Sequence, residues 1–144
     1  MTKLALKKPN LAMPALALNA LLAVAAVAVA PALGVAQQRA IPVVPGQNQG
    51  YDACGIIGEV AGLDPNGDGF LAVRAGPDGD YAMLDQLHNG DAVYICDQSG
   101  PWLGVVYPGY QDCGVSSPWP QAAAYQGPCS SGWVHQKYVR EAAG

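Results

Sequence analysis

Short hydrophobic runs separated by turn residues recur along the chain from residue 56 onward. Each run is rich in β-branched and aromatic residues and is bounded by Gly, Asp, Asn or Pro, which is the pattern of β-strands joined by turns. No stretch keeps the helical period of about 3.6 residues over several turns. The pattern predicts an all-β domain of five or six short strands, folded as a small barrel or sandwich. The predicted strands are Ile56–Ala61, Phe70–Arg74, Tyr81–Leu87, Asp91–Cys96, Trp102–Tyr107, and Trp133–Val134 with a tail through Val139.

Alternation within these runs predicts which side chains face the core. Residues two positions apart share one face of a strand, so an apolar pair at that spacing marks the buried face. Arg74 is then expected to point outward. Residues 88–91 contain Asn-Gly, the strongest short signal for a hairpin turn. The pairs expected in the core are Leu71 with Val73 and Val93 with Ile95.

The first 36 residues have the composition of a secretory signal peptide. Three lysines precede a long apolar stretch, and small residues follow it at 34–36, where a signal peptidase cleaves. We predict cleavage after Ala36. The alternative is an uncleaved transmembrane anchor, although Pro14 and Pro31 interrupt the apolar stretch and no basic stop-transfer cluster follows it. Both alternatives place the rest of the chain outside the cytoplasm, as a secreted or periplasmic protein.

The remaining residues, 37–144, are acidic. They hold four basic residues and all eleven acidic residues of the chain, which gives a formal charge of −7. Nucleic-acid binding relies on clustered Lys and Arg side chains that neutralise phosphates, so nucleic acid is excluded as a partner. We also expect no contact with a membrane beyond the signal segment. The basic residues are Arg39, Arg74, Lys137 and Arg140.

Four cysteines, Cys54, Cys96, Cys113 and Cys129, follow the signal segment. An even number of cysteines in an exported chain indicates disulfides, here two, with three possible pairings. Cys113 and Cys129 bracket a stretch without a strand pattern, so a bond between them would close a loop and would leave Cys54 to pair with Cys96. A zinc site is disfavoured because no two cysteines have the short C-x-x-C spacing. We expect no cofactor.

Residues 37–50 read as a flexible leader, because Pro, Gln and Gly occur there without periodicity. The domain is predicted to span residues 51–144. A core of this size is small, so reinforcement by disulfides is expected.

The order of several short motifs resembles the bacterial SH3-like domains of exported proteins. Residues 70–77, FLAVRAGP, are similar to that family's opening L-x-V-R-x-G-P strand and turn. The resemblance continues through residues 81–84, the spacing Leu87-x-x-Gly90-x-x-Val93-x-Ile95 and the Trp102 strand. It ends at residues 132–135 and 138–139, so that it covers about residues 56 to 140.

This resemblance implies a small, partly open barrel of five or six strands. Members of the family bind peptides, cell-wall fragments or other proteins and carry out no reaction. The chain departs from the family pattern in one place, where residues 108–131 form a long insertion instead of a short hairpin turn.

Residues 64–69, DPNGDG, fit the first half of an EF-hand calcium loop. The position that should supply the closing Glu is Ala75, a proline occupies the second position, and a predicted strand follows instead of a helix. We therefore interpret the segment as an Asp- and Gly-rich loop between strands, with weak calcium binding as the alternative.

The Tyr and Trp side chains are the best candidates for a binding site. These residues combine a large apolar face with a polar tip, which suits extended ligands such as peptides and glycans. Ordinary packing is the alternative, above all for Trp133 and for Trp102, whose strand must bury one face. The candidate ligand-binding residues are Tyr81, Trp102, Trp119 and Tyr125.

The sequence thus predicts an exported binding module rather than an enzyme. Cys129, Ser130 and Ser131 lie near His135 in the sequence, but no catalytic signature accompanies them. The expected partner is a peptide, a protein or a cell-wall component outside the cytoplasm. Alternatives are an accessory subunit that docks on one exported protein through the insertion and, with less support, a small hydrolase or a calcium-dependent module.

Overall fold

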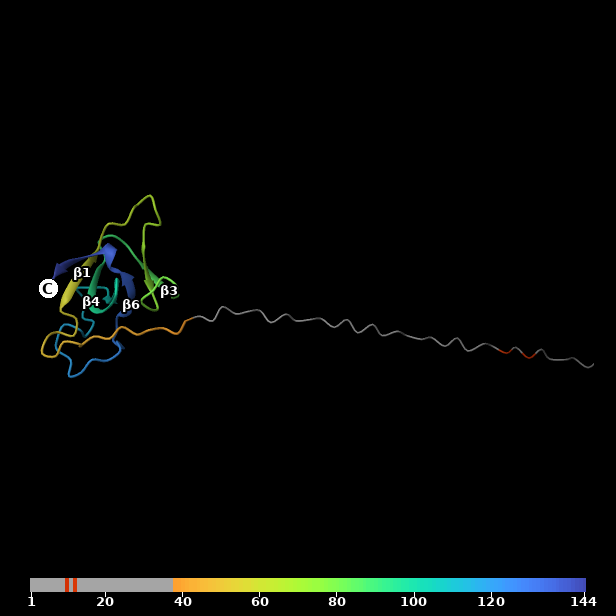
Figure 1. Ribbon diagram of the computed structural model, residues 1–144, viewed down its shortest axis with the longest axis horizontal. Coiled ribbons are helices and arrows are strands. Elements are labelled where there is room, and N and C mark those ends of the chain that lie inside the picture. Colours follow the sequence, from red (N-terminus) through yellow and green to blue (C-terminus); the bar gives the residue numbers. More distant parts are fainter. Residues whose placement is uncertain (1–9, 11, 13–37) are drawn as a thin grey trace, which may run out of the picture. The chain divides into compact units, whose positions relative to one another are not determined.

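The computed structural model describes residues 10, 12 and 38–144, shown in colour in Figure 1. The chain separates into two units, residues 1–34 and 35–144, and the account below concerns the second. The predicted signal peptide falls outside the described residues, apart from the two isolated positions. Within the described part, no helix is long and apolar enough to cross a membrane.

Seven antiparallel strands form a single sheet, which confirms the all-β prediction. The order across the sheet is β3-β2-β6-β5-β4-β1-β7, and the edge strands β3 and β7 do not pair with each other, so the sheet is not closed. The strands are β1 (Ile56–Val60), β2 (Leu71–Arg74), β3 (Met83–Leu87), β4 (Ala92–Ser99), β5 (Trp102–Tyr107), β6 (Ser130–His135) and β7 (Val139–Ala143).

The structure has seven strands where five or six were predicted, because the chain beyond the expected tail, which ended at Val139, forms an additional strand. A single 3₁₀ turn, η1 (Gln136–Tyr138), follows β6 and separates it from β7. Strand β7 then pairs with β1, where Arg140 Nη2 donates to Glu59 Oε1 at 2.8 Å. The insertion is also shorter than predicted at its C-terminal end, since β6 already begins at Ser130.

The Asn-Gly turn lies where the sequence predicts it, but it does not close a hairpin. The Asp91 N–H donates to the His88 carbonyl at 3.0 Å, and Gly90 adopts a left-handed φ of 94°. The turn leads from β3 at the sheet edge to β4, and these two strands are not neighbours. The prediction of a hairpin is therefore wrong at this position.

The main core lies inside the curved sheet, and the predicted core pairs belong to it. Leu71, Val73 and Val93 are buried, and Ile95 is half-buried against them. The same cluster contains Val60 of β1 and Leu87 of β3, strands far apart in the sheet order, so the sheet bends around it. The remaining members are Leu103, Val105, Tyr107 and Val134.

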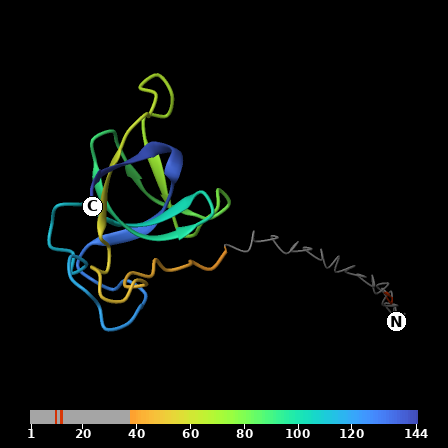
Figure 2. The same cartoon turned by 60° about the vertical axis from the view of Figure 1, so that its left-hand side comes forward.

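The outer face of the central strands carries a second, smaller core. Its buried members are Ala53, Cys54, Tyr94, Val106, Cys113 and Val115. They come from the outer face of β4 and β5, from the chain before β1 and from the insertion between β5 and β6. In Figures 1 and 2 the orange segment from residue 38 and the blue insertion gather at the same end of the domain. Both faces of the sheet are therefore covered at this end.

The prediction of a flexible leader is wrong for residues 41–46. Val43 is 2% exposed, and its carbonyl accepts a hydrogen bond from the Tyr125 N–H at 2.9 Å. The Trp133 indole Nε1–H donates to the Ile41 carbonyl at 2.8 Å, and the Val44 N–H donates to Asp97 Oδ2 at 3.0 Å. The leader is thus part of the domain, fixed by side chains that lie far away in the sequence.

Two disulfides join Cys54 to Cys96 and Cys113 to Cys129, as the loop argument favoured. The first attaches the chain before β1 to β4, and the second closes the insertion. Bonds of this kind persist in oxidising compartments outside the cytoplasm.

Candidate ligand-binding groove

A groove of about 440 Å³ is lined by the loop before β2, by β2, by the ends of β5 and β6 that meet in the register, and by the 3₁₀ turn. Ala72 and Arg74 of β2, Trp102 of β5 and His135 of β6 line it from the outer face of the sheet. Leu71, a residue of the main core, also contributes to the lining, as do Leu63 and Tyr138, which pack against that core. The loop before β2 and the 3₁₀ turn supply the rest of the wall. The aromatic, basic and thioether side chains of the lining are Phe70, Arg74, Met83, Trp102, His135 and Tyr138, and Asp64 and Asp68 contribute carboxylates from the loop.

Trp102 lies at the start of β5 and is held against His135. The two residues are opposite each other in the β5–β6 register, and their rings meet edge to face with centroids 5.4 Å apart. Trp102 is half-buried, so one part of its ring faces the groove. The indole N–H groups of Trp119 and Trp133 donate to backbone carbonyls, whereas that of Trp102 donates to no described residue. Trp102 therefore contributes an aromatic surface to the groove.

The loop at residues 61–70 forms one wall and projects from the strands at the end opposite the insertion (Figures 1 and 2). Its base is clamped by Asn89: the Leu63 N–H donates to Asn89 Oδ1 at 3.1 Å, and Asn89 Nδ2 donates back to the Leu63 carbonyl at 3.2 Å. The tip is an Asx turn, in which Asp64 Oδ1 accepts from the Asn66 N–H at 2.8 Å. Asp64 and Asp68 are exposed on this ordered loop.

This turn is the segment that resembles half of an EF-hand. One carboxylate oxygen of Asp64 accepts from the backbone N–H of Asn66, so this oxygen is engaged within the turn itself. Within residues 38–144 no three His, Cys, Asp or Glu side chains converge as a metal site.

Arg74 marks another part of the groove. Its Nη1 donates to the Tyr81 carbonyl at 2.9 Å, which fixes the half-buried guanidinium beside the turn between β2 and β3. Arg74 points away from the core, as predicted, because Val73 before it occupies the inner face. Met83, opposite Arg74 in the register, is 49% exposed.

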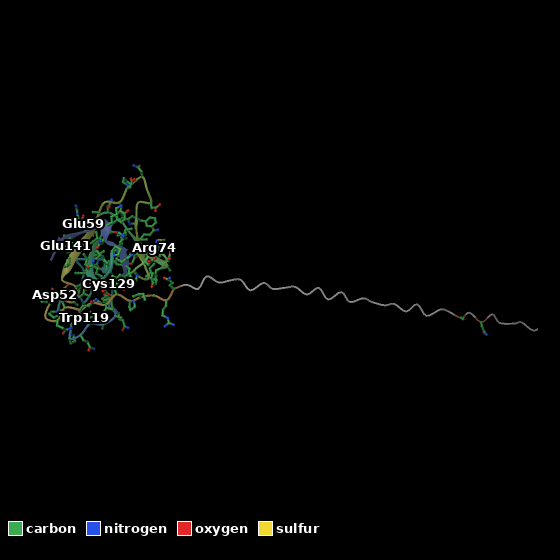
Figure 3. The ribbon with its side chains drawn as sticks, in the orientation of Figure 1. Asp52, Glu59, Arg74, Trp119, Cys129 and Glu141 are labelled. Carbon is green, nitrogen blue, oxygen red and sulfur yellow. A yellow bond between two sulfur atoms is a disulfide. The ribbon has the colours of Figure 1, made fainter. Side chains whose placement is uncertain are left out.

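The four candidate binding residues do not come together. Trp102 lines the groove, while Tyr81 lies in the turn after β2, where its ring covers Gly76 so closely that a Cβ there would overlap it. Trp119 and Tyr125 are in the insertion and pack against the second core. Figure 3 shows Trp119 at the lower end of the domain, away from Arg74 of the groove.

Trp119 and Tyr125 have structural roles in the insertion. The Trp119 indole N–H donates to the Gly114 carbonyl at 2.9 Å, and its side chain lies against Gly46. The Tyr125 hydroxyl donates to the Cys113 carbonyl at 2.8 Å and accepts from the Cys129 N–H at 3.0 Å. It therefore bridges the two ends of the loop that the disulfide closes. Neither polar tip is left for a ligand.

Two other chemical groups lie outside the groove. The Tyr107 hydroxyl donates to Asp85 Oδ2 at 3.1 Å on the core side of the sheet. Burial, together with the nearby Asp85 charge, raises the pKa of the Tyr107 hydroxyl above its ordinary value. Ser130 and His135 lie at opposite ends of β6, and all four cysteines are in disulfides, so the residues near Cys129 do not form a nucleophile with its base.

The groove contains residues that the sequence did not single out as binding residues. The sequence placed Phe70 and Met83 in predicted strands and His135 in the tail after Val134, where it was weighed as a catalytic base. Asp64 and Asp68 belonged to a possible calcium loop. Phe70 is the only phenylalanine of the chain, and it directly follows the acidic residues Asp64 and Asp68. This position beside the loop is the one sequence signal that could have indicated that the loop contributes to a groove.

No model of a known protein family matches this chain, and no match was found among curated proteins or among solved structures.

Proposed function

We propose that the protein is an exported, non-catalytic SH3-like binding module whose ligand is a peptide, a protein or a component of the cell envelope. The observation that carries this proposal is the groove around Trp102, in which a half-buried indole ring lines an open cavity. Side chains of this type anchor ligands because they bury a large area and still make a directed hydrogen bond.

Export is supported by two independent features. The first 36 residues have the composition of a signal peptide, and the rest of the chain holds two disulfides and no free cysteine. We therefore place the module in the periplasm or outside the cell. The SH3-like assignment rests on the order of motifs from residue 70 to residue 139.

Retention on isolated envelope material tests the proposal. The purified, oxidised protein is incubated with peptidoglycan and with envelope extract, and the bound fraction is measured for the wild type, Trp102→Ala and Tyr51→Ala. Tyr51 is 74% exposed and lies outside the groove, so it is the matched aromatic control. We expect Trp102→Ala to weaken retention about 10-fold or more and Tyr51→Ala to leave it unchanged.

Equal retention of the wild type and a folded Trp102→Ala variant would show that the groove is not the binding site. No retention of the wild type above background on either material would count against the binding function itself.

A further inference from the structure

We propose that the free edge of β7 binds an extended segment of another protein as an additional strand, and that the pocket beside this edge takes one of its apolar side chains. The pocket shares no lining residue with the Trp102 groove, so the inference goes beyond the proposed function and does not depend on it. Figure 3 shows Glu141 of β7 on the left of the domain, beside Glu59, and Arg74 of the groove on the right.

Strand β7 leaves part of its backbone without a partner. The Ala61 N–H donates to the Tyr138 carbonyl at 2.9 Å, and bonded residues alternate along an antiparallel pair, so Val139 and Glu141 face away from β1. The Val139 N–H agrees with this direction, because it donates to the Gln136 carbonyl of the 3₁₀ turn. The backbone N–H and carbonyl of Glu141 are bonded to no described residue, and they point out from the edge of the sheet.

The other edge of the sheet, β3, has its donors covered by carboxylates. The Gln86 N–H donates to Asp85 Oδ1 at 2.8 Å, and the His88 N–H donates to Asp91 Oδ2 at 2.7 Å. These two N–H groups are two residues apart, so they lie on the same side of the strand, the side away from β2. Charged side chains at an edge hinder pairing with another chain. Glu141 has no such cap, so of the two edges β7 is the one open to strand addition.

A pocket of about 540 Å³ lies beside the inner face of β7. Val139 and Glu141 both line it, because residues two positions apart share one face of a strand. Its floor is apolar, since Leu103 belongs to the main core and Ile95 packs against that core, while Ile56 lies opposite Ile95 in the register. A residue of an added strand that lies opposite Val139 or Glu141 shares their face, so its side chain enters this pocket.

Charge indicates which kind of segment fits. Glu141 is exposed and forms no ion pair with a described residue, so a basic residue opposite it makes a favourable cross-strand pair. Lys137, the cation of the lining, lies over the Tyr138 ring, 5.4 Å from its centre. A second copy of the chain would bring the same charge of −7 over residues 37–144. The occupant is therefore a segment of another protein in which a basic residue alternates with apolar ones.

Two capped peptides isolate the charge. The first is acetyl-Thr-Ile-Thr-Lys-Thr-Ile-Thr-amide, in which the two Ile residues and the Lys share one face of an extended strand. The second has Glu in place of the Lys. Binding to the purified, oxidised protein is followed by NMR. The local readout is the rate of hydrogen exchange at the Glu141 amide, because strand addition gives that N–H an acceptor.

Three variants test the position of the site. Ile56→Thr and Ile57→Thr are a matched pair, because these neighbours are both half-buried and face opposite sides of β1. Ile56 lines the pocket, whereas Ile57 packs against the second core. Threonine keeps the β-branched shape in both. The third variant, Glu141→Lys, reverses the charge at the edge.

We expect the Lys peptide to slow exchange at Glu141 about 10-fold or more when it is bound, and to bind at least about 3-fold more tightly than the Glu peptide. Glu141→Lys should abolish or reverse this preference. Ile56→Thr should weaken binding of the Lys peptide, and Ile57→Thr should not. Unchanged exchange at Glu141 with millimolar peptide, an unchanged preference in Glu141→Lys, or equal effects of the two Thr variants would overturn the inference.

A second copy as the occupant gives a different result. Exchange at Glu141 that slows with rising protein concentration in the absence of peptide, together with a dimer mass in sedimentation, would show that another copy covers the edge and would overturn the foreign partner. These outcomes are distinct from failure of the proposed function, which is measured by envelope retention of Trp102→Ala.

Discussion

Replacing Tyr125 by Phe removes a single oxygen atom that fastens the insertion. The Tyr125 hydroxyl donates to the Cys113 carbonyl and accepts from the Cys129 N–H, at 2.8 and 3.0 Å. Phenylalanine keeps the ring and its packing against the second core but leaves both backbone groups without this partner. The substitution therefore tests whether the residue is a structural bridge or a ligand contact.

The expected destabilisation follows from the two lost hydrogen bonds. Each contributes a net stabilisation of about 1 kcal/mol. Tyr125 is half-buried, so water can replace part of what is lost, and we expect a total of about 1 to 2 kcal/mol. Tyr51→Phe is the control, since Tyr51 is 74% exposed, and its effect should stay within about 0.5 kcal/mol.

Urea unfolding of the oxidised protein, followed by tryptophan fluorescence, measures the difference. At an m value of about 1.5 kcal/mol per molar urea, the Tyr125→Phe midpoint should fall by roughly 1 M. The envelope retention of the folded variant should equal that of the wild type, because Tyr125 does not line the groove. Equal midpoints for the two Phe variants would refute the bridge, and lost retention by folded Tyr125→Phe would place the ligand on the insertion.

Three further substitutions test the packing, the buried hydroxyl and the second disulfide. Gly132→Ala should lower the free energy of unfolding by about 1 to 3 kcal/mol, because the new Cβ would overlap the Val73 side chain of the next strand, whereas Gly79→Ala meets no atom within 4 Å and should be neutral in thermal melts. The pKa of the Tyr107 hydroxyl is raised in the folded state, so above about pH 10 the folded state keeps a proton that the unfolded state loses. The free energy of unfolding should therefore fall above about pH 10, by up to about 1.4 kcal/mol per pH unit. Tyr107→Phe should flatten this slope in urea titrations at pH 9 to 11.5. Replacing Cys113 and Cys129 together by Ser opens a loop with a sequence separation of 16 and should destabilise the protein by about 3 kcal/mol, while equal stability of oxidised wild type and variant would contradict a native bond.

The strands that the sequence predicted share a clear local signal. Alternating apolar residues placed Leu71, Val73 and Val93 in the core, and the structure confirms all three. Strand β7 lacks that signal, because Arg140 and Glu141 are exposed at a sheet edge and only Val139 is half-buried. Its existence depends on pairing with β1, which is distant in the sequence.

The groove was harder to predict because it is assembled across the sheet. Trp102 and His135 meet only since β5 and β6 are neighbours, and the insertion separates these strands in the chain. Trp119 and Tyr125 occur in a loop context that suggested exposure, yet they cover a second core that depends on residues 41–46 and 53–54. Contacts between residues so far apart in the sequence depend on the order of the strands in the sheet. Local sequence patterns do not contain that order.

Residues 41–46 are made before the strand against which they pack. Ile41 is bonded to the indole of Trp133, 92 residues further along the chain. At a synthesis rate of about 5 to 20 residues per second, that partner appears roughly 5 to 20 s later. Val43 and Pro45, which are fully buried in the folded protein, are thus made early in the domain, well before the strand that holds the neighbouring Ile41. The chain carries them exposed until β6 is available, so the native packing of this segment cannot form before nearly the whole domain is present.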